Sequence, residues 1–298
     1  MPGASLSVRG LARRFEDRLA VNHLDFEVLG GEILGLVGPN GAGKTTTLRC
    51  VAGILPAHAG EIQIAGHSIA REGIEAKKRL AYVQDEPAPF EVLTVDEHLE
   101  FTARLFGLGE SWRQRADELL ERFELVDRRD ALGSSLSRGM RQKLSFCIAL
   151  LTRPAVILLD EPLSGLDPRG IRAARAAIEE ESARGAAVVL SSHLLELVQS
   201  LADRILIIDA GRCVFKGTLD EARLEIKARQ GGSGAGGLGG GASVQESSLE
   251  DIFFAATGES SASPAVDQAA GDRAVDDRAE GDTDGDPRAH GDEVPGTR

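Results

Sequence analysis

The chain has 298 residues, of which 42% are hydrophobic, and a formal net charge of −13 at pH 7. This length allows one large or two modest domains, and the acidic balance lacks the basic footprint of a nucleic-acid-binding protein. No apolar run approaches the ~18 residues of a membrane-spanning helix, and residues 1–7 lack the charged-then-apolar layout of a signal peptide.

Two strand-like runs, 6–9 and 24–28, open the chain on either side of a polar turn at residues 16–18. Their apolar and β-branched side chains favour strands, and the charged turn between them favours a reversal of the chain. Phe15 precedes this turn and lies upstream of a glycine-rich stretch.

An apolar run at 33–37 ends in Gly38-x-x-x-x-Gly43-Lys44-Thr45, and a helix-like stretch, 46–52, follows. This order of strand, glycine-rich turn and helix start is the phosphate-binding loop template. Glycines let backbone N–H groups curl around an anion, and the helix adds free N–H groups and its positive dipole end. Lys44 brings positive charge to the outer phosphates, and the Thr45 hydroxyl is placed to ligate Mg²⁺. The predicted nucleoside triphosphate site comprises Gly38, Pro39, Asn40, Gly41, Ala42, Gly43, Lys44, Thr45 and Thr46.

Two further strands are predicted after this helix. Residues 60–69 alternate between polar and apolar side chains, as a half-exposed strand does. Residues 79–84 favour a short buried strand that ends at Gln84, and the prolines of 87–90 then break the regular structure.

Residues 94–126 have a helical pattern. Thr94 and Glu97 form a capping box, with the threonine at the cap and the glutamate three residues later. Apolar side chains then recur at helical spacing on both sides of a glycine-containing break. We therefore expect a helical insert, about 88–150, between two strand-rich parts of the chain.

Strands and helices alternate beyond the insert. The continuous apolar run 155–160 is typical of a strand buried on both faces. The remaining predicted elements are helices at 168–184 and 194–201, strands at 186–191 and 204–209, and a hairpin strand at 213–216. Strands that alternate with helices behind a phosphate loop indicate a mostly parallel sheet flanked by helices.

Candidate functional side chains stand at the ends of these elements. Asp160 and Glu161 follow an apolar strand, at the end where parallel sheets place ligands. Asp160 is a candidate Mg²⁺ ligand, and Glu161 is a candidate general base for an attacking water. Ser137 and Gly139 stand at the predicted start of a helix. This helix N-terminus either binds an anion or is an ordinary N-terminus capped by Ser137. His193, after the next strand, has either a phosphate-binding or a structural role.

The C-terminal part changes composition. Residues 231–243 hold eight glycines in thirteen and are predicted to form a flexible linker, followed by a short segment at 244–258 with an apolar patch. Residues 259–298 carry eleven acidic and four basic residues and no aromatic side chain. This composition predicts a disordered, solvated acidic tail, with an interaction arm as the alternative.

Cysteine usage indicates a reducing compartment. Cys50, Cys147 and Cys213 are far apart and lie in apolar or strand-like runs. We interpret all three as free core thiols, and their spacing excludes a disulfide or zinc framework. We therefore expect a cytosolic protein.

Six elements stand in the order found in the ATP-binding cassette (ABC) family, and residues 5–217 resemble that family. They are the Walker A loop (38–45), the loop glutamine (Gln84), the signature (136–140), Walker B (156–161), the D-loop (164–167) and the switch histidine (His193). The resemblance implies an α/β P-loop NTPase cassette over residues 1–230. It also implies a mostly parallel, helix-flanked sheet, an antiparallel β subdomain and a helical insert.

The resemblance implies a dimer of two cassettes, identical or different, that close head to tail. Each ATP then lies between the Walker A loop of one subunit and the signature of the other. Ser137 and Gly139 would contact the γ-phosphate across the interface. Phe15 would stack on the adenine, without the hydroxyl of the tyrosine that is usual in the family.

Mg²⁺-dependent ATP hydrolysis is the activity that the resemblance implies. Thr45 and Asp160 would hold Mg²⁺, Asp160 through water, and Glu161 would act as the general base. Gln84 would touch Mg²⁺ or the attacking water and sense the partner, and His193 would donate to a phosphate oxygen.

The signature departs from the usual Leu-Ser-Gly-Gly-Gln, because residues 136–140 are Leu-Ser-Arg-Gly-Met. Ser137 and Gly139 are kept, and Arg138 in an ordinary backbone conformation still presents the next N–H, so we expect hydrolysis to be kept. The form Ser-Arg-Gly-Met-Arg-Gln and residues 248–258 are similar to single-cassette subunits of drug-, antibiotic- and polysaccharide-type exporters.

This similarity implies the energy-coupling subunit of a membrane exporter, peripheral on the inner face of the cell membrane. A separate transmembrane permease would dock on the helical insert and the loop after Gln84. The alternative is a soluble cassette protein that acts on ribosomes or DNA. Ribosome-acting relatives usually carry two cassettes in one chain, whereas this sequence shows one. Chromosome and repair relatives separate Walker A from the signature by long coiled coils or zinc modules, and neither feature lies between Thr45 and Leu136. A regulatory cassette without turnover is disfavoured by Glu161 and His193, and no nucleic-acid partner is expected.

Overall fold

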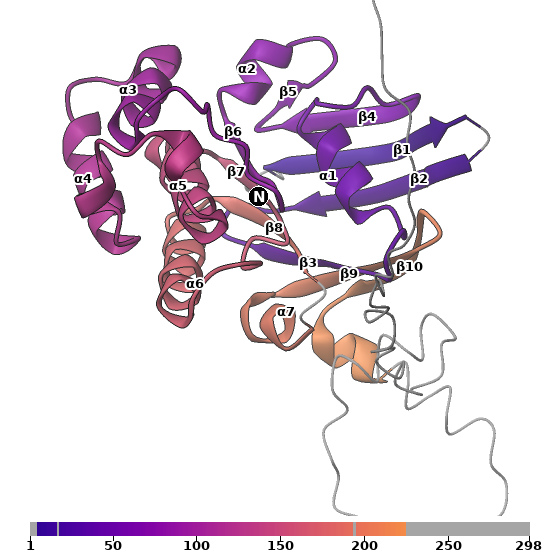
Figure 1. Ribbon diagram of the computed structural model, residues 1–298. Helices are drawn as coiled ribbons and strands as arrows, with labels where there is room; N and C mark the ends of the chain where they lie inside the picture. Colours follow the sequence, from indigo (N-terminus) through magenta and orange to yellow (C-terminus); the bar gives the residue numbers. More distant parts are fainter. Residues whose placement is uncertain (1–4, 17, 193–194, 225–298) are drawn as a thin grey trace, which may run out of the picture. The chain divides into compact units, whose positions relative to one another are not determined.

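The computed structural model describes residues 5–16, 18–192 and 195–224 (Figure 1). The chain divides into two units, and every described residue belongs to the first, Met1–Ser261. His193, the glycine-rich linker, the segment 244–258 and the acidic tail lie outside the described residues, so what the sequence indicates for them stays a prediction. In the described part of the chain, no helix is both long and apolar enough to cross a bilayer.

A six-stranded sheet runs through this unit (Figure 1). In spatial order its strands are β10 (Arg212–Gly217), β9 (Arg204–Asp209), β3 (Ile33–Val37), β8 (Ala187–Ser191), β7 (Val156–Asp160) and β6 (Leu80–Val83). The five strands from β9 to β6 are parallel, and β10 pairs with β9 in antiparallel fashion. The predicted mostly parallel sheet and its closing hairpin are therefore confirmed.

The apolar strands of this sheet divide their side chains between two cores. In β7, Ile157 and Leu159 pack in a core shared with the helices, whereas Val156 and Leu158 pack in a second core with the antiparallel strands. All five residues of β7 are buried. A strand covered on both faces needs apolar side chains at every position, which explains the unbroken apolar run.

A separate antiparallel sheet covers the second core. Its spatial order is β2 (Arg18–Val28), β1 (Leu6–Phe15), β4 (Ala59–Ile64) and β5 (His67–Ser68). β1 and β2 are longer than the predicted runs because register shifts after Val8, Leu11 and Arg13 interrupt the alternation that sequence reasoning follows. The single strand predicted at 60–69 is wrong, because a turn at residues 65–66 divides it into β4 and β5.

The described part of the chain also contains α-helices, two short 3₁₀ turns and, after β10, a further helical stretch at residues 219–224. The helices are α1 (Lys44–Val51), α2 (Gly73–Lys77), α3 (Val95–Phe106), α4 (Trp112–Arg122), α5 (Arg138–Leu151), α6 (Pro168–Ala183) and α7 (Leu195–Leu201). The 3₁₀ turns are Val126–Arg128 and Gly133–Ser135.

The capping box before α3 is confirmed: Thr94 Oγ1 accepts from the Glu97 N–H at 3.2 Å, and the Glu97 carboxylate accepts from the Thr94 N–H at 2.7 Å. The five-residue α2 was not predicted, because it is too short to show a helical period.

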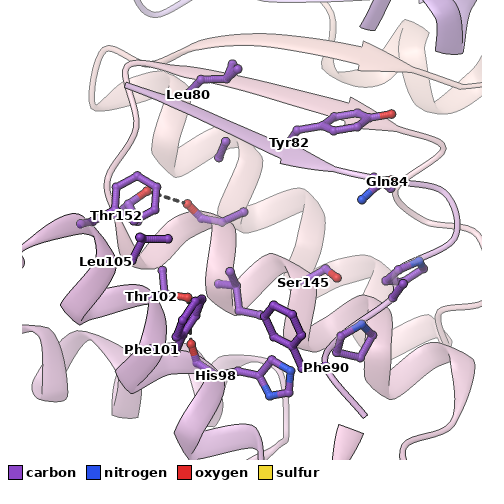
Figure 2. A pocket seen from close by; sticks show the side chains of 17 residues that line it. Leu80, Tyr82, Gln84, Phe90, His98, Phe101, Thr102, Leu105, Ser145 and Thr152 are labelled. Atoms are coloured by element: carbon purple, nitrogen blue, oxygen red, sulfur yellow. Dashed lines mark hydrogen bonds between the residues drawn. The ribbon is translucent and has the colours of Figure 1, made fainter. Parts of the chain in front are cut away.

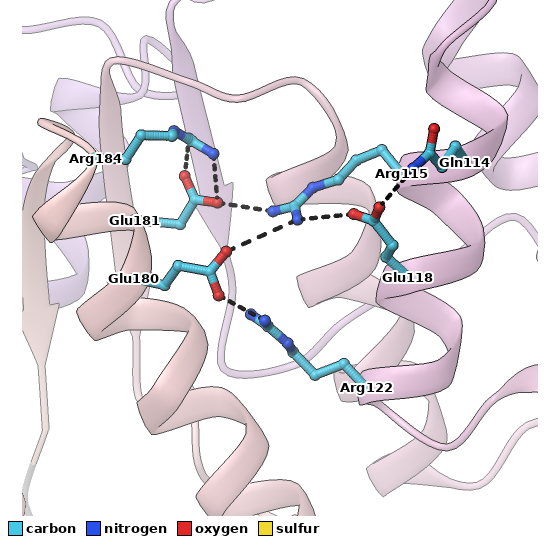
Figure 3. A network of polar contacts seen from close by, with 7 residues as sticks. All are labelled: Gln114, Arg115, Glu118, Arg122, Glu180, Glu181 and Arg184. Carbon is cyan, nitrogen blue, oxygen red and sulfur yellow. Dashed lines mark hydrogen bonds and ion pairs between the residues drawn. The ribbon is translucent and has the colours of Figure 1, made fainter.

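An ion-pair network joins α4 to α6 (Figure 3). Arg115 on α4 donates to the buried carboxylate of Glu181 on α6 at 3.0 Å, and Glu181 also pairs with Arg184. Closer to solvent, Arg122 donates to Glu180 at 2.5 Å. The network attaches the helical insert to a helix that flanks the parallel sheet.

One prediction about the cysteines is wrong. Cys50 and Cys147 are buried and free, as expected, but Cys213 is free and exposed. Cys213 lies on β10, at the edge of the sheet, where the strand is not covered as the central strands are. An apolar neighbourhood in the sequence does not distinguish an edge strand from a central one.

Candidate nucleotide site

The phosphate-binding loop connects β3 to α1, as the sequence predicts. Gly43 has φ +107°, and a Cβ at this position would lie 2.4 Å from the carbonyl oxygen of Ala20 on β2. Glycine is required there both for the left-handed backbone and for the close approach of β2. The Gly211 N–H donates to the Ala42 carbonyl at 2.9 Å, so the loop is also supported from the β9–β10 turn.

The first turn of α1 is available to an anion. Among the described residues, no side chain caps this turn and no acidic residue lies in it. The first helical hydrogen bond runs from the Thr47 N–H to the Gly43 carbonyl at 2.8 Å, so the N–H groups of Lys44, Thr45 and Thr46 precede the helical ladder. Unpaired N–H groups at the positive end of a helix favour a phosphate.

Lys44 begins α1 and bends back over the loop. Its ammonium group donates to the Gly38 carbonyl at 2.6 Å and to the Pro39 carbonyl at 3.1 Å, and the residue is only 8% exposed. Burial lowers the pKa of Lys44, and the carboxylates of Glu161 and Asp160 oppose that shift. A buried cation held by neutral carbonyls keeps its positive charge for a polyanionic ligand.

Thr45 and Asp160 meet although they are far apart in the sequence. The Thr45 hydroxyl donates to Asp160 Oδ1 at 3.2 Å, and Asp160 is 1% exposed. In the described part of the chain, no cluster of three or more His, Cys, Asp or Glu side chains is suited to a metal. One hydroxyl beside one carboxylate nevertheless fits Mg²⁺, which takes few protein ligands and keeps waters and substrate phosphates.

Tyr82 is a site residue that the sequence reasoning missed. It lies on β6, and its hydroxyl donates to Asp160 Oδ2 at 3.2 Å. Burial is the main cause that raises the pKa of Tyr82, and the nearby Asp160 carboxylate adds to it, so the phenol stays protonated and remains a donor. The available signal was a hydroxyl-bearing aromatic side chain inside an otherwise apolar strand.

Glu161 has a left-handed backbone conformation, with φ +48°, directly after β7. Its N–H donates to the Ser191 carbonyl at 3.0 Å, which ties the turn to the end of β8. Side-chain-bearing residues seldom adopt this conformation, and such outliers concentrate at functional sites. The Ser191 hydroxyl is buried and has no hydrogen-bond partner among the described residues, so this end of the sheet holds a polar atom suited to a ligand or water.

Gln84 and Phe15 are exposed, whereas Lys44 and Asp160 are buried. Gln84 follows β6 and is exposed; within the described residues it makes no hydrogen bond to Thr45 or Asp160. Phe15 ends β1 and is 42% exposed, with the Arg13 guanidinium 4.7 Å from its ring centroid. Arg18, at the start of β2, donates to the Gly41 carbonyl at 3.1 Å, so the hairpin that carries Phe15 contacts the phosphate loop.

The signature residues lie at the start of α5. The Ser137 hydroxyl accepts from the Met140 N–H at 3.3 Å and caps this helix. A Cβ on Gly139 would lie 2.7 Å from the carbonyl oxygen of Gly165, so glycine allows the D-loop to pack directly on the helix. Among the described contacts, α5 thus begins against the turn after Glu161 and not against its own phosphate loop.

A cleft of about 330 Å³ opens between β6, the loop after Gln84, α3 and α5 (Figure 2). Its lining includes Leu80, Tyr82, Gln84, Phe90, His98, Phe101, Thr102, Leu105, Ser145 and Thr152. Several of these side chains are apolar yet exposed: Phe90 is 57% exposed, Phe101 46% and Leu105 67%. Exposed aromatic and aliphatic side chains that gather in a concave surface mark an interaction site.

Comparison with known proteins identifies relatives of this chain. The sequence profile of the family described as "ABC transporter" matches residues 21–164, which include the phosphate loop, Asp160 and Glu161. The chain is 40% identical over 233 residues to the daunorubicin resistance ATP-binding protein DrrA3 of Streptomyces coeruleorubidus, covering 78% of this chain and 72% of the relative. It is 36% identical over 218 residues to the Nod factor export ATP-binding protein I of Burkholderia lata, covering 73% of this chain and 72% of that protein. A solved structure of an ATP-binding subunit of an ABC transporter matches with a TM-score of 0.76 and 32% identity, covering 84% of this chain and 98% of that chain.

Proposed function

This chain belongs to the ATP-binding subunits of ABC transporters, which are ATPases, and we propose that it powers an exporter through a separate membrane permease. The names of two relatives support the direction of transport, since one is a daunorubicin resistance protein and the other a Nod factor export protein. Peripheral attachment to the inner face of the cell membrane would then follow from binding to the permease.

The meeting of Thr45, Asp160 and Lys44 at the ends of β3 and β7 carries the proposal for hydrolysis. The loop 38–46 binds the triphosphate through its N–H groups, and Lys44 leaves the loop carbonyls to pair with the outer phosphates. The Thr45 hydroxyl and the Asp160 carboxylate would hold the Mg²⁺ that accompanies ATP. Mg²⁺ held there would neutralise part of the negative charge of the phosphates.

Glu161 is the proposed general base. Glu161 directly follows Asp160, the proposed metal ligand, at the end of the buried strand β7. The backbone bond to Ser191 fixes the turn, which keeps the carboxylate aimed while it takes a proton from water. Gln84 and His193 are proposed to orient that water and to donate to a phosphate oxygen, and Phe15 is proposed to stack on the adenine.

We further propose that ATP is sandwiched between two cassettes. Ser137 and Arg138 are exposed and Gly139 is partly exposed, and the start of α5 packs against the D-loop of its own chain. The first turn of α5 therefore remains accessible to the phosphate of a second subunit. Ser137 and Gly139 would complete the site across that interface.

The cleft beside the loop after Gln84 is the proposed docking site for the permease. Phe90, Phe101 and Leu105 supply an apolar floor and rim for a short helix from its cytoplasmic side. Gln84 lines the same cleft, so an occupant of the cleft would contact the residue proposed to sense it.

Co-purification tests this proposal. The tagged Glu161→Gln protein, purified with ATP from detergent-solubilised membranes, should recover a polytopic membrane protein in equal amount. Adding Leu105→Asp should lower that recovery at least about tenfold, since it places a charge in the apolar cleft. Ile74→Asp is the matched control, because Ile74 is 74% exposed on α2 and does not line the cleft. Recovery of ribosomes or nucleic acid in place of a membrane protein would overturn the transport role and leave the ATPase chemistry standing.

A further inference from the structure

Arg138 connects two loops that lie far from each other in the sequence. It stands where the family signature usually has glycine, and its side chain is 57% exposed. The Nη2 atom donates to Ser164 Oγ at 3.0 Å and to Asp85 Oδ1 at 3.4 Å. Because Nη2 carries two hydrogens, both bonds form at once.

The two partners of Arg138 belong to loops with different proposed roles. Asp85 follows Gln84 in the loop that lines the docking cleft. Ser164 lies in the turn after β7, where its N–H donates to the Glu161 carbonyl at 3.1 Å. Arg138 thus contacts the loop that lines the cleft, through Asp85, and the turn that follows Glu161, the proposed general base, through Ser164.

The packing around Arg138 favours transmission of a displacement. Gly165 has φ +77°, and a Cβ there would lie 3.3 Å from Arg138 Cδ, so the arginine stem lies directly over the D-loop. The Gln142 amide donates to the Pro162 carbonyl at 2.9 Å, which holds the first turns of α5 to the same loop. The start of α5 and residues 162–165 therefore form one packed unit, and Asp85 is a contact of Arg138 outside that unit.

We propose that Arg138 is a positioning residue that transmits occupation of the docking cleft to the turn carrying Glu161. An occupant that displaces residues 84–90 changes the position of Asp85, and Arg138 passes the change to Ser164. A glycine at position 138 has no side chain with which to make either bond. This inference rests on the proposed permease, whose binding supplies the displacement.

The test uses the purified complex with its permease and compares ATPase activity with that of the isolated subunit. Arg138→Gln should lower the permease-stimulated kcat by about two- to fivefold, the range that an exposed ion pair supplies, with KM for ATP unchanged. Arg138→Lys should restore part of the stimulation, because an ammonium group keeps the charge without the planar fork. Asp85→Asn should lower the stimulated rate similarly and leave the rate of the isolated subunit unchanged. Arg71→Gln is the matched control, since Arg71 forms an exposed ion pair with Glu61 and does not line the cleft.

The double variant tests whether Arg138 and Asp85 act as one connected pair. If Arg138 acts through Asp85, Arg138→Gln combined with Asp85→Asn should lower the stimulation no further than either change alone. If the losses of stimulation caused by the two single changes multiply in the double variant, the proposal is overturned. It is also overturned if the ATPase rate falls equally in the isolated subunit and in the complex. A raised KM for ATP with normal stimulation would make Arg138 a nucleotide contact instead. A wild-type complex without any permease stimulation would count against the proposed function itself.

Discussion

Two regions of this protein bury charged side chains, and they compensate the charge differently. At the nucleotide site, Lys44 is held by backbone carbonyls, and burial lowers its pKa. In the network between α4 and α6, Glu181 is 1% exposed and pairs with two guanidinium groups, those of Arg115 and Arg184 (Figure 3).

The comparison separates a buried charge that is available to a ligand from a buried charge that stabilises the fold. Neutral carbonyls satisfy the hydrogen bonds of Lys44 but do not neutralise it, so a triphosphate gains from binding there. Glu181 is already compensated by its own chain, and removing a partner leaves an uncompensated buried charge. Changes at the nucleotide site should therefore alter activity, and changes in the network should alter stability.

The largest effect on activity is expected for Glu161→Gln. The amide cannot accept a proton from water, so the rate of ATP hydrolysis should fall by about 10²- to 10⁴-fold. ATP binding should persist, and ATP-trapped dimers should accumulate on size-exclusion chromatography. The midpoint of thermal unfolding should not fall. Unchanged turnover would show that Glu161 is not the base.

Arg115→Leu should produce the largest loss of stability. The substitution removes one of the two cations that pair with buried Glu181, and the free energy of unfolding should fall by about 2–3 kcal/mol. Urea denaturation measures this value. Arg122→Gln is the comparison variant, because the Arg122–Glu180 pair is more exposed and its loss should cost less than about 1 kcal/mol. Similar small losses in both variants would contradict a structural role for the buried pair.

Lys44→Ala should weaken ATP binding without lowering stability. Charge-assisted hydrogen bonds contribute about 1.5–3 kcal/mol, so the Kd for ATP should rise by roughly 10- to 150-fold. Isothermal titration with ATP measures the change, and urea denaturation of the same variant provides the control. A variant with normal affinity for ATP would count against the phosphate-loop assignment.

Tyr82→Phe should have the smallest effect of the four. The change removes the hydroxyl that donates to Asp160 and leaves the bond from Thr45. The loss of one hydrogen bond to a charged group is worth about 1.5 kcal/mol, so the Mg²⁺ concentration for half-maximal ATPase should rise by about tenfold or less. A decrease in kcat of more than a hundredfold would instead place Tyr82 in the chemistry.

Local patterns in the sequence were sufficient for the parallel strands and the phosphate loop. The run from β3 to α1 combines a buried strand, glycines at fixed spacing and a helix start, and each has a conformational requirement within a few residues. Thr94 and Glu97 predicted their capping box for the same reason. The antiparallel strands were predicted less well, because the shifts after Val8 and Leu11 depend on the neighbouring strand.

The sequence by itself determined the order of the elements, the phosphate loop and the candidate carboxylates, because those depend on short-range geometry and on apolar patterns. Only the tertiary structure decided which side chains meet. Thr45 reaches Asp160 across 115 positions, and Tyr82 reaches it across 78. Arg138 joins Asp85 and Ser164 for the same reason, and Cys213 is exposed because β10 is an edge strand. Contacts of this kind follow from the order of strands in the sheet and the packing of loops at its ends, which no local pattern specifies.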